Sequence, residues 1–285
     1  MYITFKKMMK KIVFLFCHVL HFQSIFPFTP TSYSQSLLLH LQKKHGNHKK
    51  IGYKKSRQIL FHEFGNMIIY GSNKNNTQKE INCEHIWCQK YFKNKEPMKS
   101  DLHILYLSNA KLNSHRQDYK FSNLPSNCTY MDIKGNKINM THYIHHTNIY
   151  KKDNTKKIFE PYDKSKGKIA RSLAYYYTIY SYSTNSYNNS IEKLIDIDDL
   201  LKWNKENLPC LDELYRNIII EKYQDNINPF IKYPVLIELI FQTNIKVSNV
   251  FYLGLYSILS GLLSELLYFL MKNNDFHKNK YIKKN

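Results

Sequence analysis

The sequence contains little that would support a cysteine-based site. Its five cysteines are Cys17, Cys83, Cys88, Cys128 and Cys210, and no two of them are separated by two residues. Zinc ribbons and thioredoxin-like redox centres depend on that spacing, so both classes are disfavoured. Removal of an N-terminal leader would leave four cysteines, an even number that is compatible with disulfides outside the cytosol. Each cysteine also suits a small buried apolar position.

Acidic residues are scarce, with 22 Asp and Glu against 42 Lys and Arg, which gives a net charge of +20. A surface this basic favours a polyanionic partner, either nucleic acid or an acidic membrane face. AT-rich coding also enriches Lys, Asn, Ile and Tyr, so charge alone does not decide between binding and composition bias. The 285 residues are 43% hydrophobic and show no internal repeat. They suffice for one sizeable core with appendages.

The N-terminal segment has the pattern of a secretory leader. Lys6, Lys7, Lys10 and Lys11 precede the short apolar run 12–22, IVFLFCHVLHF. A basic stretch before such a run is typical of a signal segment, and the run is short for a membrane span. We therefore expect residues 1–35 to be a targeting leader and spacer that direct the chain to the secretory route or an organelle. An uncleaved anchor or an amphipathic helix is the alternative.

The C-terminal segment, residues 246–285, is predicted to be an apolar helix followed by a basic tail. Residues 250–271, VFYLGLYSILSGLLSELLYFLM, are long enough to cross a bilayer. Glu265 lies inside this run and argues against a simple span, because a central carboxylate is costly there. The sequence thus allows membrane contact through residues 248–271, or packing of the helix on the domain.

Between these segments, patterns of helices and strands predict a mixed α+β domain. Residues 66–71 (NMIIYG) and 80–87 (EINCEHIW) are β-rich and flank a polar link, which predicts a hairpin whose second strand carries Glu84 and His85. Asn109 and Asn113 are four apart and would share a helix face. Residues 122–157 look polar and irregular. Further helices are expected within residues 34–50, 56–64, 169–180, 196–208 and 214–224.

Glu84, His85 and Asn113 could together support hydrolysis of a phosphodiester. A histidine can take a proton from water near neutral pH. A hard divalent cation prefers carboxylate and amide oxygens and keeps several waters. Taken alone, however, an adjacent Glu-His pair is more often a surface pair on a strand, and Asn on a helix is usually solvated.

The residues around this pair change that assessment. CEHIWCQKYF, followed by SDLHILYLSNAKLNSHRQDYKF, resembles the Glu-His-x-Trp-Pro-Gln, Asp-Leu-His-Asn-Leu and Val-Asn-Ser-x-Arg segments of the bacterial endonuclease I family. IFEPYDKSKGKIARSLAYYY, LLKWNKENL and RNIIIEKYQDNINPFIKYP are similar to later segments of the same family. These are ββα-metal (His-Me finger) nucleases. Five motifs recur in the same order from about residue 50 to about 245, which is a specific match.

The resemblance implies a role for each matching residue. His85 matches the general base, and Glu84 and Asn113 match the ligands of a divalent metal, Mg²⁺ or another such as Mn²⁺ or Ca²⁺. Arg116 matches an arginine that holds a phosphate or braces the site. Asn109, which stands where the family usually has Asp, is expected to support a metal ligand.

Other matches imply supporting roles. His103 is expected to be structural or to contact a ligand residue, and Lys166 and Arg171 are expected to be structural or to face nucleic acid. Some family members carry an arginine on a long insertion that holds the cleaved phosphate. Here the corresponding segment, residues 93–99, is short and contains no arginine, so Lys93, Lys95 or Lys99 would have to replace it.

One geometric objection follows from the predicted strand. Consecutive strand residues point to opposite faces, so Glu84 and His85 should not share a site on a regular strand. The pair can converge only if the strand ends, bulges or twists sharply there. We therefore expect an irregular strand end that leads into a loop, with a helix carrying Asn113 packed across it.

The sequence thus predicts a ββα-metal hairpin and helix surrounded by additional helices, with the nuclease domain at residues 50–245. The implied activity is metal-dependent, sequence-nonspecific cleavage of DNA, with RNA as a further substrate, to give 5′-phosphate ends. No obligate protein partner is implied. The alternatives are a catalytically inactive nucleic-acid-binding module and a membrane-associated protein that uses the C-terminal apolar helix.

Overall fold

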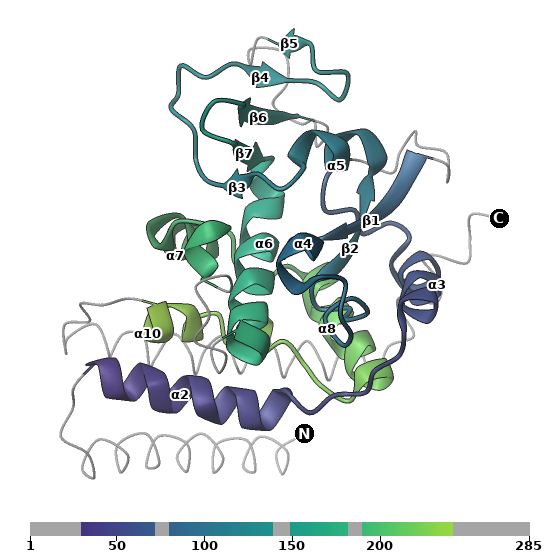
Figure 1. Cartoon of the computed structure of the whole chain (residues 1–285), viewed down its shortest axis with the longest axis vertical. Helices are drawn as coiled ribbons and strands as arrows, with labels where there is room; N and C mark the ends of the chain where they lie inside the picture. Colours follow the sequence, from purple (N-terminus) through teal and green to yellow (C-terminus); the bar gives the residue numbers. More distant parts are fainter. Residues whose placement is uncertain (1–29, 72–79, 139–148, 182–189, 242–285) are drawn as a thin grey trace, which may run out of the picture.

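The computed structural model describes residues 30–71, 80–138, 149–181 and 190–241 (Figure 1). These residues form a mixed α+β fold with two small sheets and several helices, which confirms the predicted fold class. The larger sheet lies at one end of the molecule (Figure 1). The strands are β1 (Ile81–His85), β2 (Leu105–Asn109), β3 (Lys120–Phe121), β4 (Tyr130–Met131), β5 (Lys137–Ile138), β6 (Tyr150–Asp153) and β7 (Ile158–Pro161). The helices are α2 (Pro30–His45), α3 (Tyr53–Phe64), α4 (Gln89–Phe92), α5 (Ala110–Arg116), α6 (Asp163–Tyr176), α7 (Ile197–Glu206), α8 (Leu211–Gln224), α9 (Pro229–Lys232) and α10 (Leu236–Phe241).

Strands β1 and β2 and helix α5 form a compact ββα unit. The two strands pair antiparallel over their whole length, from Ile81 opposite Asn109 to His85 opposite Leu105. Helix α5 follows β2 directly, and the Asn109 Oδ1 accepts hydrogen bonds from the backbone N–H groups of Lys111 and Leu112. Asn109 is therefore the N-cap of α5, and the prediction that it shares a helix face with Asn113 is wrong.

The predicted partner of β1 was also wrong. Residues 66–71 lie beside β2 instead, because the Ile69 N–H donates to the Leu107 carbonyl at 2.8 Å and the Asn109 N–H donates to the Tyr70 carbonyl at 3.0 Å. Every residue of β2 is buried. A strand buried on both faces need not alternate between apolar and polar residues, so no such pattern marked residues 105–109 as a strand.

The second sheet has the strand order β3-β7-β6-β4-β5. Three of its strands, β4, β5 and β6, lie in the stretch 122–157 that was predicted to be irregular, and that prediction is wrong for them. The strands are two to four residues long and carry polar side chains, so they show no hydrophobic alternation. Their stability comes from pairing with β7 and with each other. Residues 139–148 of this stretch lie outside the described residues.

Apolar clusters cover both faces of the β1–β2 ribbon. On one face Tyr106 belongs to the cluster that contains Leu173 of α6. On the other face Leu107 belongs to the cluster formed with Leu60 of α3 and Ile220 of α8. The ribbon is therefore held between α6 on one side and α3 with α8 on the other, which fixes what each strand side chain meets.

The helices predicted around this ribbon are present and pack closely. The predicted segments 56–64, 169–180, 196–208 and 214–224 overlap α3, α6, α7 and α8. Helix α6 passes so close to the end of α7 that a Cβ atom on Gly167 would lie 2.3 Å from the Asn207 carbonyl oxygen. Only glycine allows this approach, which brings α6 into the centre of the fold (Figure 1).

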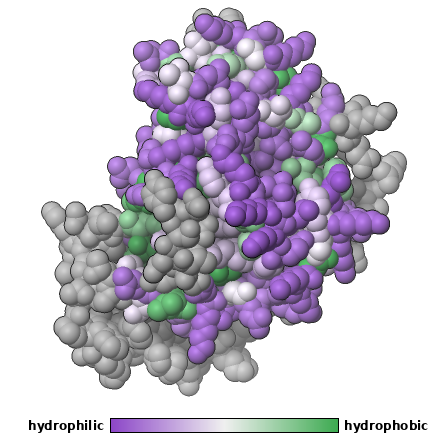
Figure 2. Space-filling view, viewed as in Figure 1, coloured by the Kyte–Doolittle hydropathy of each residue, from purple (hydrophilic) through white to green (hydrophobic). Residues whose placement is uncertain are grey.

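The two terminal predictions fall largely outside the described residues. Residues 1–29 and 242–285 are not described, so the leader run and the C-terminal apolar run lie outside them. Within the part that is described, no helix is both long and apolar enough to cross a membrane. Most residues visible on the face in Figure 2 are hydrophilic. The four described cysteines are free thiols, namely Cys83, Cys88, Cys128 and Cys210.

Candidate active site

The candidate site lies along one edge of β1. The Ile86 N–H donates to the Ile104 carbonyl, so the backbone groups of even-numbered residues in β1 face β2. The backbone groups of Cys83 and His85 consequently face the other edge. Within the described residues β1 pairs only with β2, so no strand covers that edge. The side-chain amide of Asn113 reaches it and donates to the Cys83 carbonyl at 3.3 Å.

Glu84 is buried on the α6 side of the ribbon and has two polar partners on one oxygen. The Tyr70 hydroxyl donates to Glu84 Oε1 at 3.3 Å, and the Arg116 Nη1 lies 3.3 Å from the same oxygen. Burial raises the pKa of Glu84 to about 7, while Arg116, Tyr70 and the backbone N–H of His85 act in the opposite direction. The contact with the His85 N–H brings the carboxylate toward the uncovered edge of β1.

His85 points to the opposite face of the ribbon and is held on three sides. Its Nε2 lies 2.9 Å from the Lys99 carbonyl oxygen. Its ring stacks on Tyr53 of α3, with centroids 5.8 Å apart, and packs against Phe92 of α4 at 5.6 Å. A carbonyl can only accept, so Nε2 carries the proton and Nδ1 keeps a free lone pair in the neutral ring. Burial lowers the pKa of His85 to about 4, so the ring is neutral at neutral pH.

The predicted irregular strand end is only partly right. β1 does end at His85, but its pairing with β2 is regular through that residue and contains no bulge. Glu84 and His85 therefore remain on opposite faces, as alternation requires. Both residues flank the uncovered edge of the strand, where Asn113 also binds.

Asn113 presents one amide oxygen to this edge. Its Nδ2 donates to Asn82 Oδ1 at 3.0 Å and to the Cys83 carbonyl, so both bonds use the nitrogen. These bonds fix the amide orientation and leave Oδ1 outside both contacts. Asn109 holds the start of α5, the helix that carries Asn113. Asn109 therefore acts on Asn113 only indirectly, by capping the helix that carries it.

Arg116, at the end of α5, is buried and braces the site from inside. Its Nη2 donates to the Ile86 carbonyl at 3.0 Å and its Nη1 donates to the Gln117 carbonyl at 3.0 Å. Nη1 also lies 3.0 Å from the Cys88 sulfur and contacts Glu84. Of the two roles that the sequence allowed for Arg116, this geometry favours the bracing role over contact with a phosphate.

His103, Lys166 and Arg171 are not brought to this edge. His103 is buried with its Nε2 3.3 Å from the Asn226 carbonyl oxygen. The Lys166 Nζ lies 2.7 Å from Glu160 Oε1 and is mostly buried. The three residues lie inside the fold.

Arg171 is buried and its guanidinium is paired with a carboxylate. Its Nε and Nη2 donate to the two carboxylate oxygens of Glu213 at 2.6 and 2.7 Å, and the side chain is 1% exposed. A guanidinium engaged in this way has few donors left for a phosphate. The structure favours the structural role that the sequence allowed for Lys166 and Arg171.

The donors at the edge of β1 fit a hard divalent cation. Glu84 Oε2 takes no part in the contacts with Tyr70 and Arg116, and Asn113 Oδ1 takes no part in the contacts with the strand. A carboxylate oxygen and an amide oxygen are donors that Mg²⁺ accepts while it keeps several waters. In the described ranges no group of three or more His, Cys, Asp and Glu side chains gathers that could hold a metal ion.

Two tyrosines at the site could not be found by sequence reasoning. Tyr70 bonds Glu84 and Tyr53 stacks on His85, and both lie in segments that carry no recognisable motif. Tyr70 and Tyr53 are not sequence neighbours of the residues they contact, so no spacing pattern predicts these two contacts. Their aromatic character was the only available signal, and it is weak in a chain with 24 tyrosines.

Sequence comparisons show which known proteins this chain is similar to. A sequence model described as Endonuclease I matches residues 25–235. The extracellular ribonuclease of Bacillus amyloliquefaciens is 31% identical over 165 residues, which cover 54% of this chain and 51% of that protein. The extracellular ribonuclease of Bacillus subtilis (strain 168) is 28% identical over 188 residues, or 59% of each. The chain therefore spans between half and three-fifths of the length of these curated relatives.

Proposed function

The chain belongs to the endonuclease I family, and we propose that it is a metal-dependent nuclease that hydrolyses phosphodiester bonds of DNA and RNA. One observation carries this proposal: Glu84, His85 and Asn113 flank the uncovered edge of β1 within the segment that the family model matches. The names of the two Bacillus relatives support RNA as a substrate beside DNA.

In the proposed reaction His85 is the general base. Its Nδ1 takes a proton from water as the water oxygen attacks phosphorus, and the bond from phosphorus to the 3′-oxygen breaks. The products are a 5′-phosphate and a 3′-hydroxyl, which takes its proton from solvent. The Lys99 carbonyl holds Nε2–H and so keeps the lone pair on Nδ1.

Glu84 and Asn113 are proposed to hold the divalent cation through Oε2 and Oδ1. When bound, Mg²⁺ or a similar ion would stabilise negative charge on the phosphate and on the leaving oxygen. Arg116 and Tyr70 keep Glu84 in place, and Asn82 keeps the Asn113 amide in place. These three contacts orient the two side chains before substrate arrives.

We propose that cleavage is independent of sequence and that the protein acts outside the cytosol. A net charge of +20 favours contacts with phosphates, which carry no base information. The relatives are named as extracellular proteins, in line with the predicted leader. Because Leu38 and Leu41 of α2 pack in the core, we place the end of a removed leader before this helix begins at Pro30.

The test is digestion of plasmid, single-stranded DNA and RNA by the purified chain with Mg²⁺ titrated and with EDTA. We expect EDTA-sensitive cleavage at many positions, with 5′-phosphate ends on the products. The folded His85→Ala variant is the matched control for contaminating nucleases. Equal cleavage by this variant, or binding without any cleavage by the native chain, would contradict the proposal and favour an inactive binding module.

A further inference from the structure

Helix α3 brings aromatic and basic side chains to the face of the ribbon that carries His85. Tyr53 stacks on the His85 ring, and the Lys99 Nζ lies 5.3 Å from the centroid of the Tyr53 ring. Lys99 therefore approaches His85 twice, through its backbone carbonyl and through an ammonium group held over the neighbouring tyrosine. The ammonium stays on the His85 side of β1.

A second cation lies one helical turn beyond Tyr53. Arg57 is exposed and is four residues after Tyr53, so the two side chains share a face of α3. Tyr53 and Cys83 pack against the same apolar cluster, which places this face of α3 beside β1. Arg57 therefore lies on the face of α3 that is beside β1, the strand in which the Cys83 carbonyl is bonded to Asn113.

Neither cation is neutralised by a carboxylate. Within the part of the chain that the structure describes, no ion pair involves Arg57 or Lys99, whereas Arg116 is paired with Glu84 and Lys90 with Asp118. Two unpaired cations on one side of a site favour an incoming anion, because the anion relieves their mutual repulsion. The anion that the proposed reaction requires here is a phosphate.

We propose that Arg57 and Lys99 bind the phosphate group that His85 and the cation site act on. The inference rests on the proposed function and adds to it the residues that hold the substrate. The guanidinium of Arg57 can contact two phosphate oxygens at once, whereas Lys99 adds a point charge. Together they supply the cationic group that the short segment 93–99 cannot supply as an arginine.

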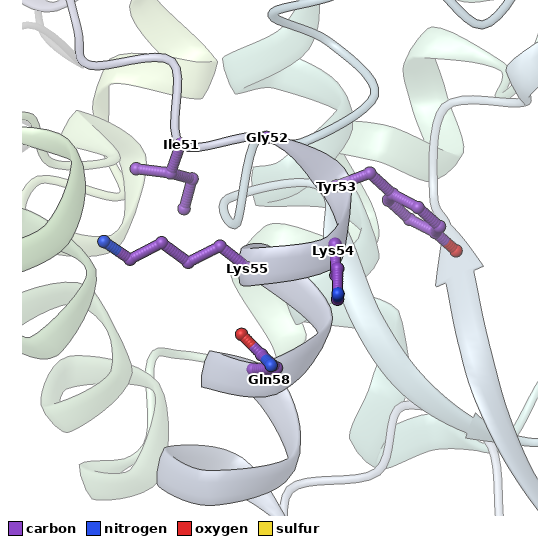
Figure 3. Close-up of a pocket in the computed structure, with 6 residues that line it drawn as sticks. All are labelled: Ile51, Gly52, Tyr53, Lys54, Lys55 and Gln58. Atoms are coloured by element: carbon purple, nitrogen blue, oxygen red, sulfur yellow. The ribbon is translucent and has the colours of Figure 1, made fainter.

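The experiment compares Arg57→Ala and Lys99→Ala with Lys55→Ala. Figure 3 shows Tyr53 and Lys55 pointing in opposite directions from the start of α3, so Lys55 is a control on the same helix with the same loss of charge. Arg57→Lys keeps the positive charge but removes the planar guanidinium, so it tests whether contact with two phosphate oxygens is needed. Circular dichroism checks the fold of each variant.

The first measurement is binding of a fluorescent single-stranded phosphorothioate oligonucleotide in EDTA, by anisotropy. We expect Arg57→Ala to weaken binding about tenfold or more, as for the loss of a charged hydrogen bond, with a smaller loss for Lys99→Ala. Arg57→Lys should recover part of the loss. Lys55→Ala should bind within about twofold of the native chain, as for a screened surface charge.

The second measurement is hydrolysis of a small chromogenic phosphodiester with Mg²⁺, because such a substrate contacts only groups beside the reacting phosphate. Arg57→Ala should lose activity on it, and Lys55→Ala should not. If Arg57→Ala matches Lys55→Ala in either measurement, the inference is wrong while the nuclease function stands. If the native chain cleaves nothing but binds oligonucleotide in an Arg57-dependent way, the function fails and the phosphate site stands.

Discussion

Replacing Arg116 by methionine should remove the brace that holds Glu84 and leave a carboxylate buried without its cation. Arg116 is 1% exposed, lies 3.3 Å from Glu84 Oε1, and donates to the carbonyls of Ile86 and Gln117. Loss of one partner of a buried ion pair typically costs about 3–5 kcal/mol. We expect the free energy of unfolding to fall by that amount, which lowers the melting temperature of a domain this size by roughly 6–20 °C.

The cause can be separated from a general loss of packing by a double-mutant cycle. Glu84→Gln removes the charge that Arg116→Met leaves unpaired, so the double variant should cost less than the sum of the two single changes. A coupling energy of about 1–3 kcal/mol is expected for residues in contact. Lys111→Met, which removes an exposed cation from the same helix, should change stability by less than about 0.5 kcal/mol.

The assay is urea unfolding followed by circular dichroism, with oligonucleotide binding in EDTA measured below the unfolding range. If Arg116 only holds Glu84 in place, the folded Arg116→Met variant should bind oligonucleotide as the native chain does. Two results would refute the reasoning: additive stability changes in the cycle, or a loss of binding as large as that of Arg57→Ala. The second result would assign Arg116 to the phosphate instead.

Three other changes have distinct expected outcomes. Folded His85→Ala should lower the rate by roughly 10²–10⁴-fold with the Mg²⁺ requirement unchanged, and a near-native rate would exclude His85 as the base. Glu84→Ala and Asn113→Ala should both raise the Mg²⁺ concentration needed for half-maximal rate, since they share one ion; an unchanged requirement in either would remove that residue from the ligand set. Burial lowers the pKa values of His45 and His103 to about 4, so the unfolded chain binds more protons between about pH 6.5 and 4 and the free energy of unfolding should fall as pH drops through that window. Urea unfolding at pH 7 and pH 5 measures this loss of free energy of unfolding. The loss should be smaller in His45→Gln than in the native chain, and an equal loss would show that His45 does not contribute.

The sequence supplied the chemical groups of the candidate site but not the architecture that surrounds them. The chemical types of Glu84, His85 and Asn113 follow from their side chains alone, and the order of the motifs follows from the chain. Helices such as α3 and α8 were also predictable, because their apolar residues recur with helical spacing. These features depend on residues that are near each other in the sequence.

Strand β2 shows where local patterns failed. Both faces of β2 are buried by helices that come from distant parts of the chain, so its residues lack the alternation by which a strand is recognised. The pairing of residues 66–71 with β2, and not with β1, is likewise a choice between two edges that no local signal encodes.

The roles of the charged residues were decided by burial and by distant partners. Arg116 and Arg57 are the same residue type, yet one is enclosed with Glu84 and the other is exposed on α3. By itself, the sequence determined which groups are available for acid–base work and for binding oxygen-loving cations. Only the tertiary structure decided which cations are neutralised inside the fold and which remain for an anion, because burial and pairing depend on residues brought together from far along the chain.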